Sequence, residues 1–269
     1  MAFRYTTNNN KDFSSLKSKY VTNPNKKDKT FFNSLGDSFL LKNEYRKAIK
    51  EYLVSLMLDK NNLRAHKGAS IAYKNLKEYE KAIKHLKSAR EVYSFDSEVY
   101  YELGLNYLLS ADSENAQKNF IRTIKLQPDN KNAQIKLALT HELSGERQMA
   151  IMVYETIIER YPQFIPAYSN LAGIYIESED YVKAIKLFRR IIKINDKYHR
   201  GYLGLGLCFD RLEEYSLAVR FYKKYIALKP KSSTAKSLVG RIYEIRNKKS
   251  RKEIVKNSKF KVISNEKDI

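Results

Sequence analysis

Cysteine, tryptophan and long apolar runs are scarce or absent in this sequence, and these absences exclude several classes of protein. The single cysteine, Cys208, rules out an intramolecular disulfide and a cysteine-based zinc cluster. No apolar run approaches the ~18 residues of a membrane span, and the N-terminal residues contain no stretch suited to the core of a signal peptide. We therefore expect a soluble, cytoplasmic protein.

Catalytic motifs are absent as well. The sequence contains no HExxH, P-loop, GxGxxG, GxSxG or CxxC pattern. His66 and His141 fall at packing positions of the repeat described below, which predicts structural roles for both. Cys208 stands between Leu207 and Phe209 on the inward side of a predicted helix, where we expect a core thiol rather than a nucleophile. We predict a protein that is not an enzyme and needs neither cofactor nor metal.

Positive charge predominates in the sequence. The formal net charge is +21 and the sequence pI about 9.7, with part of the excess in the terminal segments. Such a balance is typical of proteins that bind nucleic acid or an anionic surface. It also follows from a composition rich in Lys, Asn, Ile and Tyr, whose codons are AT-rich, so that both interpretations stay open.

The sequence contains an internal period of 34 residues that begins at Lys29 and continues without an insertion. An alanine recurs at one position of every unit: Ala48, Ala82, Ala116, Ala150, Ala184 and Ala218. Four residues later stands a large side chain: Tyr52, Leu86, Phe120, Tyr154, Phe188 and Tyr222. Twelve residues before the alanine stands a small one: Gly36, Ser70, Gly104, Ala138, Ala172 and Gly206.

The apolar positions within each unit recur at three, four and seven residues, which predicts helices. The 5 prolines and 9 glycines are few, and no proline lies inside a predicted helix, where it would break the hydrogen-bond ladder. Turn-tolerant residues such as Asn43 and Gly145 separate two helices in each unit. One helical hairpin cannot bury its apolar face alone, whereas stacked hairpins share a continuous core.

At these residues the sequence resembles the tetratricopeptide repeat family. The third unit carries the family pattern most fully: Tyr100, Leu103, Gly104, Tyr107, Ala116, Phe120 and Pro128. The resemblance implies an all-α fold, a right-handed superhelical solenoid of stacked helix-turn-helix hairpins with a C-terminal cap helix. It covers six units: 29–62, 63–96, 97–130, 131–164, 165–198 and 199–232. We expect a cap helix at 233–248, a flexible N-terminal segment at 1–28 and a basic disordered tail at 249–269.

The resemblance also implies a binding face, because the first helices of such repeats line a concave groove. The residues that it places there and that we single out are Lys67, Tyr101, Leu105, Leu108, Ile135, Leu139, Asn170, Arg200 and Leu203. The centre of this groove is apolar and its ends are charged. Our hypothesis is a scaffold or adaptor that grips an apolar segment of a partner's peptide or helix, while basic groups hold flanking carboxylates. Alternatively, several of these leucines pack against the neighbouring first helix, or the superhelix closes on itself.

Two other functions remain open at this point. One position of the second helices forms a basic ladder: Lys50, Lys84, Lys118, Lys186 and Arg220. With the basic tail, this ladder could follow RNA or an anionic surface, although outward positions of helical repeats also favour lysine for solubility. The second is self-association, because the outer face of the last three second helices is more apolar than that of the first three.

Overall fold

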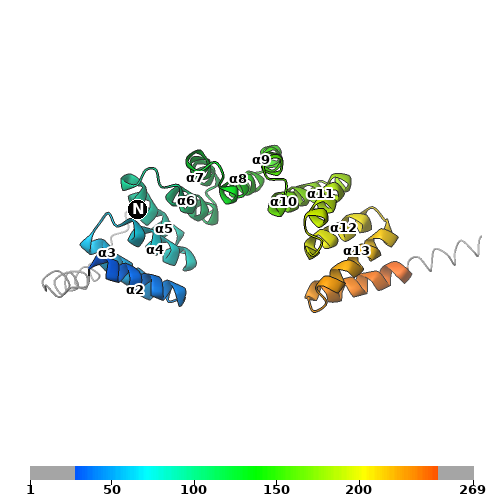
Figure 1. Ribbon diagram of the computed structural model, residues 1–269, viewed down its shortest axis with the longest axis horizontal. Helices are drawn as coiled ribbons and strands as arrows, with labels where there is room; N and C mark the ends of the chain where they lie inside the picture. The colour runs from blue at the N-terminus through cyan, green and yellow to red at the C-terminus, as the bar shows by residue number, and fades with distance from the viewer. Residues whose placement is uncertain (1–27, 248–269) are drawn as a thin grey trace, which may run out of the picture. The chain divides into compact units, whose positions relative to one another are not determined.

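The computed structural model describes residues 28–247, a range that folds into α-helices and contains no β-strand (Figure 1). The first helices of the pairs are α2 (Lys29–Leu41), α4 (Leu63–Asn75), α6 (Ser97–Leu109), α8 (Lys131–Leu143), α10 (Ile165–Glu177) and α12 (His199–Arg211). The second helices are α3 (Tyr45–Leu58), α5 (Tyr79–Val92), α7 (Ser113–Leu126), α9 (Arg147–Arg160), α11 (Tyr181–Ile194) and α13 (Tyr215–Leu228). The predictions for the N-terminal segment up to residue 27 and for the tail from 249 lie outside the described residues.

The chain divides into two compact units, with the boundary between Ala150 and Ile151. Helices α2 to α8 belong to the first unit, helices α10 to α13 belong to the second, and α9 spans the boundary. Within each unit every helix packs against the next one along the chain. Each predicted 34-residue segment thus contains one first helix and one second helix.

Short polar side chains begin many of the helices. The Asp28 carboxylate accepts hydrogen bonds from the backbone N–H groups of Thr30 (3.0 Å) and Phe31 (2.9 Å) at the start of α2. The Asn62 side chain accepts one from the N–H of Ala65 at the start of α4. Such caps satisfy N–H groups that have no partner within the helix.

The turn that ends each first helix uses a residue with a left-handed backbone. These residues are Asn43 (φ 59°), Lys77 (62°), Ala111 (62°), Gly145 (76°), Glu179 (58°) and Glu213 (59°). Asn43 and Gly145 were expected in turns, and both residue types tolerate this conformation. The alanine, lysine and glutamates adopt it against their preference, because the next helix must reverse direction at this point.

In the packed helices, the large side chain that recurs in each repeat lies against the small residues that recur with it. All six repeated alanines are 0% exposed. The ring of Tyr52 lies between Gly36 of its own repeat and Gly68 of the next, so that a Cβ at these glycines would stand 2.7 and 2.2 Å from ring atoms. The close approach of first and second helices therefore depends on missing side chains at these positions.

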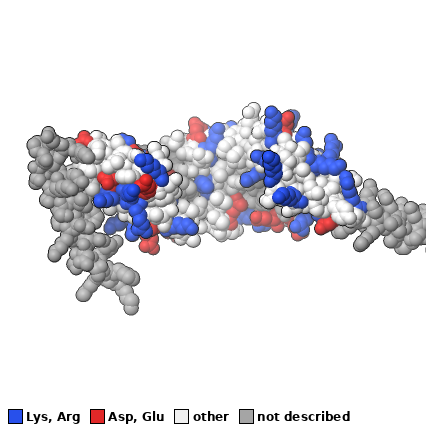
Figure 2. Space-filling model, turned by 90° about the horizontal axis from the view of Figure 1, so that it is seen from below, with Lys and Arg blue, Asp and Glu red and all other residues white. Residues whose placement is uncertain are grey.

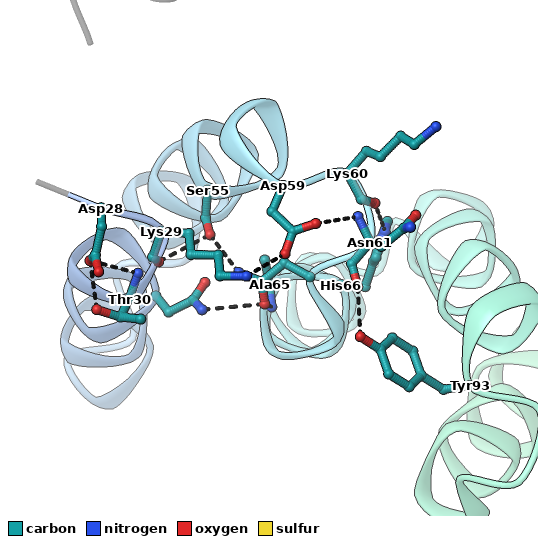
Figure 3. Close-up of polar contacts among 12 residues, drawn as sticks. Asp28, Lys29, Thr30, Ser55, Asp59, Lys60, Asn61, Ala65, His66 and Tyr93 are labelled. Atoms are coloured by element: carbon teal, nitrogen blue, oxygen red, sulfur yellow. Dashed lines mark hydrogen bonds and ion pairs between the residues drawn. The ribbon is translucent and has the colours of Figure 1, made fainter. Parts of the chain in front are cut away.

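Polar contacts link the start of α2 and the end of α3 to the turn that leads into α4 (Figure 3). Lys29 forms an ion pair with Asp59 at 2.7 Å. The hydroxyl of the buried Ser55 donates to the Lys29 carbonyl (3.1 Å) and accepts from the Asn62 amide (2.9 Å). Since Asn62 also caps α4, the same network positions the start of the second repeat.

The histidines assigned to packing positions are buried, with His66 7% and His141 8% exposed. His66 lies beside His85 of α5, whose ring stacks on Tyr73 at 5.5 Å between centroids. Burial lowers the pKa of His85 to about 4, and the charges of His66 and Lys84 act in the same direction. Burial lowers the pKa of His66 as well. The His66–His85 pair is therefore neutral at physiological pH.

Residues 233–247 form a further helical segment on the second unit. Its buried face includes Ala235, Leu238 and Ile242, which join the core of α11 to α13. On its opposite face Tyr243 is 68% exposed. An amphipathic helix of this kind suits the end of a repeat array, so the cap role stays a prediction that this packing favours.

Candidate partner-binding site

A hollow of about 410 Å³ lies between the first helices α2 and α4. Apolar and charged side chains line it together: Asp37, Leu40, Leu63, Arg64, Lys67, Gly68 and Ile71. Gly68 lines the hollow, and a Cβ at this position would meet the Tyr52 ring. An apolar floor inside a charged rim is the usual arrangement of a binding site for a side chain.

The cations of this rim are already paired with carboxylates of neighbouring repeats. Arg64 forms an ion pair with Asp37 of α2. Lys67 contacts Asp96, at 2.8 Å, and Glu98 at the start of α6. Burial opposes the Lys67 charge, but the hydrogen bonds to these two carboxylates outweigh it and raise the pKa of Lys67. Figure 2 shows basic and acidic side chains side by side over the N-terminal repeats.

The predicted apolar residues of α6 are anchored in the core. Tyr101, Leu105 and Leu108 are half-buried and pack against the buried cluster around Leu103. The ring of Tyr101 lies 5.9 Å from that of Phe120, and burial raises the pKa of its phenol. These side chains therefore contribute both to the packing and to the surface.

Helix α8 continues this apolar surface within the first unit. Ile135 and Leu139 are half-buried, like their counterparts on α6. Larger exposed fractions occur at the ends of the two helices, where Leu109 is 51% and Leu143 is 66% exposed. Exposed apolar side chains that recur at one helical position are a mark of an interaction surface.

The remaining predicted groove residues belong to the second unit. The Asn170 amide donates to the Tyr154 hydroxyl at 3.2 Å, so this side chain is already engaged. Leu203 is half-buried and packs on the core of α11 to α13. Arg200 is exposed, and no carboxylate of the described residues lies within ion-pair distance of it. Arg200 is thus better suited than Lys67 to meet a ligand carboxylate.

A hollow of about 530 Å³ next to residues 233–247 contains residues that sequence reasoning did not single out. Asp210 of α12 binds the Arg241 guanidinium through two hydrogen bonds of 2.8 Å, and it accepts another from Tyr222 at 3.0 Å. These bonds lower the pKa of Asp210, with Arg241 as the largest cause. Leu207, 42% exposed, supplies an apolar wall. The 34-residue period, extended past residue 232, could have pointed to Arg241.

The basic ladder is exposed along its length. Lys50, Lys84, Lys118, Lys186 and Arg220 all lie at the surface of second helices. Lys118 forms an ion pair with Glu114 at 2.6 Å. Lys186 lines a hollow of about 440 Å³ together with Glu155 and Glu159 of α9. The ladder is therefore unevenly compensated by carboxylates.

Residues 28–247 contain no metal-binding cluster, and their one cysteine, Cys208, is buried. No group of three or more His, Cys, Asp or Glu in this range could hold a metal ion. Burial raises the pKa of the Cys208 thiol to about 11, which keeps it protonated. None of the described helices is long and apolar enough to cross a membrane.

Models of the tetratricopeptide repeat match residues 97–130, 132–163 and 169–233. The chain belongs to the tetratricopeptide repeat family. The matched ranges fall in the third to sixth repeats, and the two preceding helix pairs repeat the same packing. Together with the solved structures below, they confirm the predicted all-α repeat solenoid.

Several solved structures resemble this tetratricopeptide repeat protein. MamA is 28% identical, with a TM-score of 0.56 over 60% of this chain and 95% of that chain. PilF of Pseudomonas aeruginosa is 15% identical, with a TM-score of 0.61 over 79% and 97%. YrrB, described as a tetratricopeptide repeat protein with an unusual peptide-binding site, is 18% identical, with a TM-score of 0.54 over 70% and 95%. No curated protein matches the sequence.

Proposed function

We propose that this protein is a scaffold or adaptor that binds a peptide or helix of a partner protein along the first helices of its repeats. The observation that carries the proposal is the hollow between α2 and α4, with its apolar floor of Leu40, Leu63 and Ile71. Proteins of this family mediate protein–protein interaction, and the peptide-binding site described for YrrB supports a similar use here.

Apolar contacts supply most of the affinity in this proposal. Lys67 and Arg64 already have carboxylate partners, so a ligand carboxylate would have to compete with Asp96 or Asp37 for them. A buried leucine-sized side chain contributes roughly 1.5–3 kcal/mol. The partner segment that fits therefore places an apolar side chain in the hollow, and its binding at the first helices is only weakly sensitive to salt.

The test is affinity capture from native lysate treated with nuclease, with the double variant Leu105→Glu/Ile135→Glu as the perturbation. Two carboxylates on the apolar first helices should abolish capture of the partner while leaving helicity, measured by circular dichroism, intact. A matched control is Met152→Glu/Val182→Glu, which makes the same chemical change on second helices, at side chains 52% and 59% exposed.

A second groove variant guards against loss of folding, because Leu105 also packs on the core. Leu109→Glu/Leu143→Glu changes the most exposed apolar side chains of the same helices, and Ile71→Glu places a carboxylate in the hollow between α2 and α4. A partner captured by the wild type and the control, and lost with these first-helix variants, supports the proposal. Equal capture by all five proteins would contradict it.

A further inference from the structure

The second helices of the last two repeats carry cations and no carboxylate. Apart from Lys183, which pairs with Asp180, their exposed basic side chains are Lys186, Arg189, Arg190 and Lys193 on α11 and Arg220, Lys223 and Lys224 on α13. On each helix they recur at spacings of three and four residues, which places them on one stripe. We call these seven residues the basic stripes. Figure 2 shows a view in which Lys and Arg are dense over the C-terminal repeats.

The earlier second helices do not share this composition. At the positions of Arg189 and Lys193, helix α9 carries Glu155 and Glu159, and α5 carries Glu91 at the second of them. A general preference for lysine on outward positions therefore does not explain the stripes. In the part of the chain that the structure describes, no carboxylate lies within ion-pair distance of any of the seven.

Carboxylates border the stripes rather than neutralise them. Glu155 and Glu159 share a hollow with Lys186 on the α9 side. Asp180 pairs with Lys183, which precedes the α11 stripe, at 3.0 Å. The cations farther along both helices thus have no carboxylate partner among the described residues, although the Lys224 ammonium lies 5.9 Å from the centre of the Tyr202 ring. Mutual repulsion raises their affinity for an external anion.

A hollow of about 550 Å³ lies beside the α13 stripe. Its floor is apolar, formed by Ile192 of α11, Tyr202 of α12, and Phe221 and Ala227 of α13, while Arg220, Lys223 and Lys224 form its rim. No carboxylate lines it. Tyr202 is only 8% exposed, and the Phe221 ring is held by stacking on Phe209 at 5.5 Å between centroids. The floor is therefore preformed.

We propose that this hollow docks an acidic segment of a partner protein. One apolar side chain of the segment enters the hollow, and carboxylates on either side of it pair with the basic stripes. The hollow lies in the second unit and its cations are on a second helix, so it shares no residue with the first-helix hollow between α2 and α4 and does not depend on it. An adaptor with both sites would hold two partners at once.

Both the charge and the shape of the hollow favour an acidic protein segment over a nucleic acid. The hollow provides a place for a side chain, which a phosphate backbone alone would leave empty. Bases of a single strand need exposed rings for stacking, whereas Tyr202 is buried and Phe221 is already stacked. The terminal segments of this chain are themselves basic, so they are repelled by the stripes.

The test uses fluorescence anisotropy with a short fluorescein-labelled peptide of Asp and Glu residues around one Phe. Charge reversal in Arg220→Glu/Lys223→Glu/Lys224→Glu should weaken binding about tenfold or more at moderate salt. The matched control, Lys50→Glu/Lys84→Glu/Lys118→Glu, makes the same change in net charge on exposed second-helix positions of the first unit. It should bind the peptide almost as well as the wild type.

A second variant tests the hollow itself. Ala227→Gln adds an uncharged side chain at an exposed position of its lining. It should reduce the affinity for the Phe peptide to that of a peptide with Gly in place of Phe. The proposal is overturned if the wild type binds both peptides equally, or if the two triple variants lose equal affinity for the Phe peptide. It is also overturned if a labelled RNA of equal charge binds the wild type more tightly than the peptide does and loses that binding in Arg220→Glu/Lys223→Glu/Lys224→Glu.

Discussion

Replacing Gly68 by alanine should destabilise the protein, whereas the same substitution at Gly173 should stabilise it. A Cβ at Gly68 would lie 2.2 Å from the Tyr52 ring, and a Cβ at Gly36 would lie 2.7 Å from the same ring, so the ring fits closely against both glycine backbones. Overpacking of this kind costs about 1–3 kcal/mol. Alanine regains about 1 kcal/mol of helix propensity, which leaves a net loss of up to roughly 2 kcal/mol.

The Gly173 variant supplies the matched control, because nothing lies within 4 Å of a Cβ built at that helical position. There only the propensity gain of about 0.5–1 kcal/mol remains. Chemical denaturation followed by circular dichroism compares the two. A Gly68→Ala protein as stable as the Gly173→Ala protein would refute the packing argument.

A rescue variant makes this test more specific. Tyr52→Leu introduces the residue that occupies the same position in the second repeat, Leu86. It removes the ring that the new Cβ meets, so the cost of Gly68→Ala should shrink in its background. A coupling energy near zero in the double-mutant cycle would locate the strain elsewhere.

Three further predictions concern the core and the turns. Ala116→Leu, at a 0% exposed helix crossing, should cost roughly 1–3 kcal/mol; a variant that melts with the wild type would mean that the repeat positions are misassigned. Burial lowers the pKa of His85 in the folded state to about 4. The contribution of neutral His85 to the free energy of unfolding should therefore be fully present above the unfolded pKa of about 6.5, and about 1–3 kcal/mol should be lost as the pH falls toward 4. Denaturation midpoints measured at several pH values should show this dependence in the wild type and not in His85→Phe. Ala111→Gly, at φ 62°, should stabilise by up to about 1 kcal/mol, and a lower midpoint in urea would contradict the strain argument.

The helices and their pairing could be predicted because each depends on residues close in sequence. The alanines at the period of 34 residues are all fully buried, as their spacing indicated. Gly68 and Gly204 were not assigned a packing role. A Cβ added at either position would nevertheless lie within 2.3 Å of an aromatic ring of the preceding repeat. Their function arises between neighbouring repeats, so a pattern read within one repeat could not show it.

The sequence could predict on which helices the residues of the candidate site lie. It could not predict which of their charges are paired. Lys67 was expected to hold a ligand carboxylate, and its position on a first helix is as the period implied. Its partners, Asp96 and Glu98, stand about thirty residues further along the chain and reach it only because the repeats stack. Whether a cation is free or paired depends on that stacking, which the composition of one repeat does not contain.

The same distinction separates two groups of cations among the described residues. In the first unit, cations on first helices such as Arg64 and Lys67 join neighbouring repeats through ion pairs. On α11 and α13 the basic stripes have no such partners among the described residues. Screening by salt acts on free charges more than on partly buried pairs. A partner bound in the first-helix hollow should therefore persist at a salt concentration that releases an acidic segment from α13, so one salt titration separates the two sites.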